Sequence, residues 1–336
     1  MKSSKVMAVT ICVVLALIAV VGLAAQIRTA DAAEGLATIK GGGKGRDLSA
    51  LTVGFAQMEN NISWRIAETN SMQGEAAKLG VTLVYTDAQS DTAKQVSDVE
   101  DMVAQGVDYI VLPPREEEGL TPALKAAQDA GIPVILIDRS VKGVPGIDYT
   151  TLIASDFVYE GEEIGKWVVN KAGGKGNIVI LEGTQGATST IDRQKGFMNI
   201  IEGTDMKIIA DQTAEYTMSG ALTAMQNIIQ AHGDAIDVVY CHNDDMALGA
   251  IQALKSAGMK PGEDVLVAGV DGAKAALEAI IAGEMSVTIQ CNPIFGPIVF
   301  ETIKRLEAGE EIPTQITNAD MLFDITNAAA NLDIAF

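Results

Sequence analysis

A cluster of chemically versatile residues stands in the segment YCHNDDMALGA (240–250), where a cysteine, a histidine, an asparagine and two aspartates are consecutive. Such residues could hold a metal ion, exchange protons or bind hydroxyl groups through hydrogen bonds. The cluster follows the apolar run DVVY and precedes MALGAIQALKSAG, whose apolar residues have helical spacing. A metal site is disfavoured because the segment has no pair of ligands at i and i+4 and no partner motif elsewhere.

Polar side chains also follow the other expected strands, at the edge where open α/β sheets bind ligands. Together with the opening cluster they are mostly Asp, Asn, Gln and Arg: Glu59, Asn60, Asn61, Trp64, Arg65, Asp138, Arg139, Asp192, Arg193, His242, Asn243, Asp244, Asp245, Asp271, Gln290 and Asn292. Arginine and aspartate present paired donors and acceptors that match vicinal hydroxyls, and a tryptophan ring can cover the C–H face of a sugar. Each of these residues taken alone could simply cap a helix or pack in the core. The inference of a sugar site therefore rests on the same residue types recurring at several strand ends.

Within the opening cluster we expect Asn243 to contact the ligand and Asp244 to cap the following helix. Asp245 is expected to support that turn or face solvent, and Cys241 and His242 to pack beneath the cleft.

Motifs of catalysis are missing from the chain, which has two histidines. It contains no G-x-S-x-G, H-E-x-x-H or paired C-x-x-C, and the first strand is followed by QMENNISW instead of a dinucleotide-binding glycine motif. The run GGGKGR lacks the G-K-[ST] ending of a phosphate loop and precedes the first strand. We therefore predict a binding protein without catalytic residues, metal ion or cofactor.

Strands and helices alternate regularly from Leu51 onward. The glycines at 80, 106 and 131 each end an expected helix and are followed at once by a β-branched run. Their spacing of 26 and 25 residues fits a βα unit, and the strands are continuous apolar runs typical of parallel sheets. The pattern restarts after about residue 150. We predict an α/β fold with two doubly wound parallel-sheet lobes and a ligand cleft between them.

Composition narrows the class of protein further. The chain has 336 residues, 48 % of them apolar, and a net charge of −20. Such an acidic chain is a poor candidate for nucleic-acid binding, because phosphate contacts need clustered Lys and Arg.

The N-terminus has the pattern of an export signal, which we place at residues 1–32. Lys2 and Lys5 precede an apolar run over 6–25, and Ala30 and Ala32 give an A-x-A cleavage pattern. The apolar run is also long enough for a retained membrane anchor, so a cleaved signal and an anchor both stay open. Either places the rest of the chain in the periplasm or at the cell surface. Residues 33–50 are expected to form a flexible linker.

Two cysteines lie outside the apolar run, at positions 241 and 291. They could pair in an exported protein or stay as buried free thiols.

Six longer stretches match one protein family: SWRIAETN (63–70), LIDRS (136–140), TQGATSTIDRQKGF (184–197), YCHNDDMALGAIQA (240–253), VDG (270–272) and QCNPIFGP (290–297). The chain resembles the type I periplasmic sugar-binding proteins, the solute receptors of ABC importers, from Leu51 to about Asn327. Within this family it is most similar to the galactofuranose-binding branch.

Together with the strand ends, the resemblance implies a set of sugar-binding residues: Trp64, Arg65, Asp138, Arg139, Arg193, Tyr216, Asn243, Asp271, Gln290 and Asn292. Gln290 is shared with ribose binders, whereas the galactofuranose branch tends to have glutamate there. The stretch MENNI also departs from that branch. The sugar therefore stays open among galactofuranose, a pentose and related sugars. We expect Arg193→Ala to abolish binding and to leave the ligand-free melting temperature nearly unchanged.

The resemblance further implies three hinge strands between discontinuous lobes. The first lobe would comprise residues 50–154 and 291–324, and the second residues 155–290 and 325–336. A monomer would close around the sugar and dock on a membrane permease. A sugar sensor for a chemoreceptor or histidine kinase is the alternative. A lactose-repressor-type regulator is disfavoured because the chain has an export signal in place of a helix-turn-helix.

Overall fold

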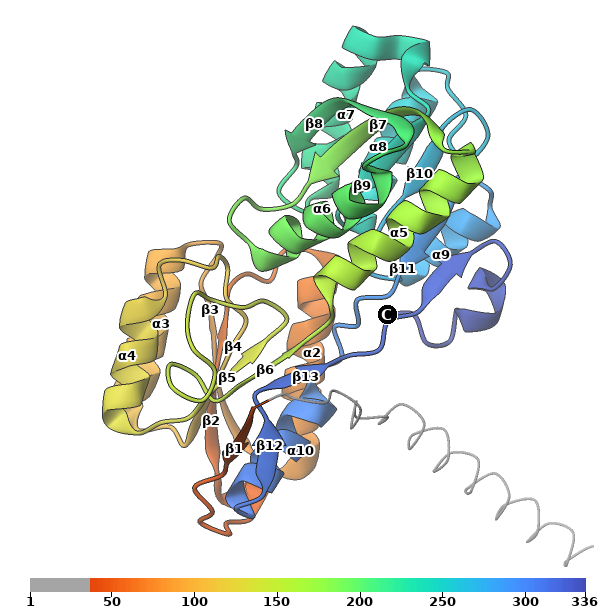
Figure 1. Ribbon diagram of the computed structural model, residues 1–336. Helices are drawn as coiled ribbons and strands as arrows, with labels where there is room; N and C mark the ends of the chain where they lie inside the picture. Colours follow the sequence, from red (N-terminus) through yellow and green to blue (C-terminus); the bar gives the residue numbers. More distant parts are fainter. Residues whose placement is uncertain (1–36) are drawn as a thin grey trace, which may run out of the picture. The chain divides into compact units, whose positions relative to one another are not determined.

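The structure is a computed structural model that describes residues 37–336 (Figure 1). The expected export signal at 1–32 lies outside this range. Within residues 37–336, no helix combines the length and the apolar character needed to cross a membrane.

The first lobe is built on a six-stranded sheet of order β13-β6-β5-β4-β2-β3, in which every pairing is parallel. Its strands are β2 (Thr52–Gln57), β3 (Thr82–Asp87), β4 (Tyr109–Leu112), β5 (Val134–Ile137), β6 (Thr151–Ala154) and β13 (Gln315–Thr317). Its helices are α2 (Ser63–Leu79), α3 (Thr92–Gln105), α4 (Thr121–Ala130) and α10 (Gly296–Glu307). Helices α2 and α10 pack together on one face of this sheet, and α3 and α4 on the other (Figure 1).

Strand β4 shows why these strands lack alternating polarity. Tyr109 and Val111 belong to the core on one face of the sheet, and Ile110 and Leu112 to the core on the other. Because helices cover both faces, every side chain of this strand is buried.

The second lobe has a six-stranded sheet of order β14-β11-β10-β9-β7-β8, parallel except for the antiparallel pair β11–β14. Its strands are β7 (Lys175–Glu182), β8 (Asp205–Thr213), β9 (Val238–Cys241), β10 (Leu266–Ala268), β11 (Val287–Ile289) and β14 (Leu322–Asp324). Its helices are α5 (Phe157–Ala172), α6 (Thr188–Ile201), α7 (Met218–His232), α8 (Asp244–Ser256) and α9 (Lys274–Ile281), with single 3₁₀ turns at η2 (Gly233–Ala235) and η3 (Ala328–Asn331). The expected two-lobe α/β architecture is confirmed.

The predicted helix ends are also confirmed. Gly80, Gly106 and Gly131 all have φ between 70° and 73°, a left-handed conformation that glycine adopts without a Cβ clash. Asp91 caps α3 by accepting a hydrogen bond of 3.0 Å from the backbone N–H of Lys94.

The chain passes between the two sheets three times, after β6, after β11 and after β13. The third crossing, from the first lobe back to the second, comes at an earlier residue than the sequence predicted. Residues 322–324 were expected in the first lobe, but β14 pairs with β11 of the second sheet. Long-range pairing with Val287–Ile289 decides this placement, and no local pattern in the short segment indicates it.

The segment expected as a flexible linker is attached to the first lobe where the structure describes it. Strand β1 (Thr38–Lys40) pairs antiparallel with β12 (Glu311–Pro313), and η1 (Leu48–Ala50) forms a short 3₁₀ turn. Arg46 forms ion pairs with Asp108 and with Glu307. These contacts join positions far apart in sequence, so the glycine-rich composition of the segment does not reveal them.

Candidate functional site

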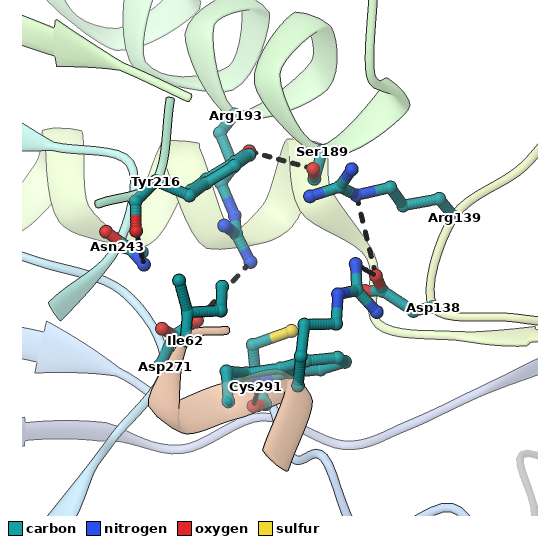
Figure 2. Close-up of a pocket in the computed structure, with 11 residues that line it drawn as sticks. Ile62, Asp138, Arg139, Ser189, Arg193, Tyr216, Asn243, Asp271 and Cys291 are labelled. Carbon is teal, nitrogen blue, oxygen red and sulfur yellow. Dashed lines mark hydrogen bonds and ion pairs between the residues drawn. The ribbon is translucent and has the colours of Figure 1, made fainter. Parts of the chain in front are cut away.

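A cavity lies at the carboxyl ends of both sheets (Figure 2). Its walls combine arginine, carboxylate and amide groups with aromatic rings: Ile62, Trp64, Arg65, Asp138, Arg139, Ser189, Arg193, Tyr216, Asn243, Asp271 and Cys291. Eight of the ten residues predicted from the sequence are among them. They come together because parallel strands end at one edge of their sheet.

The first turn of α2 supplies an aromatic ring and a guanidinium group to the cavity. The Trp64 ring is held in place because its Nε1 donates a hydrogen bond of 2.7 Å to the carbonyl of Cys291. Arg65 forms an ion pair with Asp138 and donates to Glu68 Oε2 at 2.9 Å. Burial raises the pKa of the Glu68 carboxyl, and the charge of Arg65 acts against that rise. These buried partners fix the orientation of Arg65 and Asp138.

Arg139 and Tyr216 meet across the cavity. The guanidinium carbon of Arg139 lies 5.1 Å from the centre of the Tyr216 ring, within the range of a cation–π contact. The Tyr216 hydroxyl is within hydrogen-bond distance of Ser189 Oγ (2.8 Å), a contact that Figure 2 draws. Gly183 gives the ring its space, because a Cβ at that position would come within 2.0 Å of the tyrosine ring. Burial lowers the pKa of Arg139.

Arg193 projects from α6 and connects the cavity to a buried carboxylate. Its Nε donates to Glu160 Oε2 at 2.7 Å, and its Nη1 donates to the carbonyl of His242 at 2.6 Å. Its Nη2 lies 3.9 Å from Asp271 Oδ1. Burial raises the pKa of the Asp271 carboxyl, and Arg193 acts against that rise. The Asp271 carboxylate accepts no hydrogen bond from residues 37–336, which leaves it available to a ligand.

In the 240–245 cluster the structure corrects one role. Asn243, not Asp244, caps α8: its Oδ1 accepts a hydrogen bond of 2.9 Å from Met246 N. Asp244 is fully buried and accepts from Ala273 N (2.8 Å) and Thr288 Oγ1 (2.7 Å). Burial raises its pKa to about 8. The capping preference of aspartate and asparagine is similar, so the sequence alone could not separate the two.

The neighbouring cysteine and histidine pack beneath the cleft as expected. Cys241 and His242 are both fully buried. Burial, with the nearby charge of Arg193, lowers the pKa of His242 to about 3. The ring is therefore neutral at physiological pH, and its Nε2 pairs with Gln194 Oε1 at 3.2 Å. Cys241 and Cys291 are both unpaired thiols in the described part of the chain.

Two predicted residues do not line the cavity. Gln290 forms an isolated backbone bridge with Asp271, and the side chain of Asn292 accepts from Ile294 N at 2.9 Å in a local turn. Cys291 between them faces the cavity instead, because neighbouring side chains of an extended segment point in opposite directions. Ile62 and Ser189 were also missed. Ser189 lies within a matched stretch, which was the signal available for it.

Known proteins are similar to this chain in sequence and in fold. A family model described as a periplasmic binding protein domain matches residues 53–311. The chain belongs to the periplasmic binding protein family. The galactofuranose-binding protein of Escherichia coli K12 is 40 % identical over 271 residues, which cover 80 % of this chain and 85 % of that protein. The ribose import binding protein of Bacillus subtilis 168 is 34 % identical over 268 residues, with 80 % and 85 % covered.

A solved structure agrees with this family assignment. It is the periplasmic binding protein component of the arabinose ABC transporter from Shewanella sp. ANA-3, bound to α- and β-L-arabinofuranose. It is 37 % identical, has a TM-score of 0.81, and the match covers 84 % of this chain and 95 % of that one. The resemblance inferred from the sequence is confirmed.

Proposed function

We propose that this protein is an exported receptor that captures one monosaccharide between its lobes and delivers it to the permease of an ABC importer. The observation that carries the proposal is the cavity, where arginine and carboxylate groups from both lobes converge beside aromatic rings. We further infer that it acts as a monomer and catalyses no reaction, as its relatives are named for binding alone.

The hydrogen-bonding capacity of the cavity suits a polyhydroxylated ligand. Arg65 Nε and Arg139 Nε are buried donors without a hydrogen-bond partner among residues 37–336, although Arg139 Nε lies 3.5 Å from Asp138 Oδ2. The Asp271 carboxylate accepts no hydrogen bond from these residues, and its ion-pair partner Arg193 is 3.9 Å away. Hydrogen bonds to charged groups contribute about 1.5–3 kcal/mol each. Several of them supply the roughly 8 kcal/mol of micromolar binding after the costs of ordering and closure.

The choice of ligand class rests on the polar lining of the cavity and on the relatives named above. We propose galactofuranose, a pentose or a related sugar as the ligand. The relatives named above support this class, and two of them carry import or ABC transporter in their names. For that reason we favour delivery to a permease over presentation to a sensor.

We assign the sugar contacts to the eight predicted residues that line the cavity: Trp64, Arg65, Asp138, Arg139, Arg193, Tyr216, Asn243 and Asp271. Gln290 and Asn292 are assigned a supporting role, since they hold the backbone on either side of Cys291.

A thermal-shift screen against pentoses, hexoses in both ring forms and inositols tests the proposal. A sugar present at 100 times its Kd stabilises the folded state by about 2.7 kcal/mol. Asp271→Asn keeps the shape of the side chain but removes its charge, and we expect it to weaken the binding of that sugar. Asp264→Asn, an exposed position on the same lobe, is the matched control. If no sugar raises the melting temperature and an amino acid does, the proposed ligand class is wrong.

A further inference from the structure

Helix α2, which carries Trp64 and Arg65 into the cavity, begins without a cap from its own segment. Its N-cap position is occupied by Ile62, whose side chain has no hydrogen-bonding group and makes no capping bond. The first backbone N–H groups of a helix have no intrahelical partner and need an acceptor from elsewhere. At the start of α2 that acceptor comes from the other lobe.

The acceptor is the side chain of Asp245, at the second position of α8. Its Oδ2 accepts hydrogen bonds from Ser63 Oγ at 3.0 Å and from Ser63 N at 3.3 Å. The two residues are 182 positions apart in the sequence and belong to different lobes. The carboxylate thus lies between the N-termini of α2 and α8, and the dipoles of both helices favour a negative charge there.

Asp245 has no competing role in its own lobe. Asn243 already caps α8, and Asp244 satisfies the buried groups beneath it. Among residues 37–336, Ser63 is the residue that donates hydrogen bonds to the Asp245 carboxylate, and no Lys or Arg forms an ion pair with it. Asp245 also does not line the cavity. A sugar in the cavity is therefore held by other residues, and Asp245 acts only on the contact between lobes.

We propose that Asp245 is a helix cap in trans, which forms as the lobes close and sets how long the sugar is retained. This inference rests on the proposed sugar-binding function. Closure brings the N-terminus of α8 to the N-terminus of α2, so the same movement completes the cap and encloses the side chains of Trp64 and Arg65. Asp245 is in this sense a positioning residue, since it favours the conformation in which the cavity side chains of the two lobes face each other.

Contacts from a different pair of loops hold the lobes as well. Glu117 N donates to Gly186 O at 3.0 Å, and Ser140 N donates to Thr188 Oγ1 at 3.1 Å. The first of these involves backbone atoms alone, so no side-chain substitution removes it. Loss of the Asp245 cap is therefore expected to weaken the closed state and not to abolish it.

Calorimetry and stopped-flow release of the sugar found in the screen measure the effect of Asp245→Ala. Losing a helix cap corresponds to about a 2- to 30-fold change in an equilibrium constant. We expect Kd to rise by up to that factor, mainly through faster dissociation, with both the open and the closed form populated in the absence of ligand. Asp245→Asn should restore most of the affinity, since asparagine caps helices about as well as aspartate.

Two further variants separate a trans cap from a general loss of stability. Asp91→Ala removes the cap of α3, a same-lobe cap that does not line the cavity, and should lower stability while leaving Kd unchanged. A double-mutant cycle combines Asp245→Ala with Ser63→Ala. The double variant should lose less affinity than the two single variants lose together, because each single substitution removes the same contact. Small-angle scattering gives a readout without ligand: Asp245→Ala should have a larger radius of gyration than the wild type.

Unchanged sugar release in Asp245→Ala would overturn the inference, as would additive effects of Asp245→Ala and Ser63→Ala. If no sugar binds the wild type, the proposed function is wrong, whatever Asp245 does. The scattering comparison then still tests the trans cap, and identical radii of gyration for the wild type and Asp245→Ala reject it.

Discussion

Replacing Arg193 by alanine is expected to remove both sugar binding and a large part of the folding stability. Arg193 Nε lies 2.7 Å from Glu160 Oε2, and both side chains are at most 4 % exposed. Removing one partner of a buried ion pair costs about 3–5 kcal/mol, because the other charge stays buried and unpaired. At about 2–4 °C per kcal/mol, the ligand-free melting temperature should fall by on the order of 10 °C. The sequence alone had suggested a nearly unchanged value.

The stability lost in Arg193→Ala should be greater at high pH than at low pH. Burial raises the pKa of the Glu160 carboxyl, and Arg193 acts against that rise. Without Arg193 the folded-state pKa of Glu160 rises further above its unfolded value. The folded variant then binds more protons than the unfolded chain, so its free energy of unfolding falls as the pH increases through that interval. The deficit relative to the wild type should be smaller at pH 5 than at pH 8.

Urea unfolding at both pH values, with calorimetry for the sugar, measures these effects. The double variant Arg193→Met/Glu160→Gln should be more stable than Arg193→Met, since it leaves no unpaired charge. Arg305→Ala is the matched control: Arg305 pairs with Glu310 at 3.1 Å, but the two side chains are 32 % and 55 % exposed. We expect its loss to change stability by less than about 1 kcal/mol.

Two results would refute this reasoning. A melting temperature of Arg193→Ala within about 2 °C of the wild type would mean that the pair does not stabilise the folded chain. Retained micromolar affinity would mean that Arg193 does not contact the sugar.

Three further substitutions test other parts of the structure. Tyr240→Phe removes a fully buried hydroxyl without a partner among residues 37–336 and keeps the stack on Phe197 (4.3 Å). Urea unfolding should show equal stability or a gain of about 1 kcal/mol. Asp320→Asn removes a carboxyl whose pKa burial raises to about 8. In the wild type, the contribution of the Asp320 carboxyl to the free energy of unfolding is lost as the pH rises toward its folded-state pKa. The urea midpoint of Asp320→Asn relative to that of the wild type should therefore increase from pH 5 to pH 8. Arg46→Ala breaks an ion pair with Glu307, which is 4 % exposed. It should lower stability by about 1–2 kcal/mol and leave the sugar Kd from calorimetry unchanged.

Each of these has an outcome that contradicts it. A large loss of stability in Tyr240→Phe would show that the hydroxyl has a partner. A difference between Asp320→Asn and the wild type that does not vary with pH would show that the Asp320 carboxyl titrates near its usual pKa in the folded protein. Weaker sugar binding in Arg46→Ala would show that the N-terminal segment influences the cavity.

The helix ends and the strand-end residues followed from the sequence because their causes are local. Gly80, Gly106 and Gly131 end helices through a conformation that depends on the glycine itself. Apolar periodicity separates helix from strand within a dozen residues. Parallel strands place their carboxyl ends at one edge, so Asp138, Asn243 and the other residues after strands converge without further information.

The sequence by itself thus determined the two-lobe fold, the family and most of the cavity wall. The tertiary structure alone decided which side chain does what: that Asn243 caps α8, that Cys291 faces the cavity instead of its neighbours, and that β14 joins the second sheet. It also paired Arg193 with Glu160 and Asp245 with Ser63. These roles depend on partners brought together from distant positions. A buried charge or an uncapped helix needs such a partner, but local sequence does not say where it comes from.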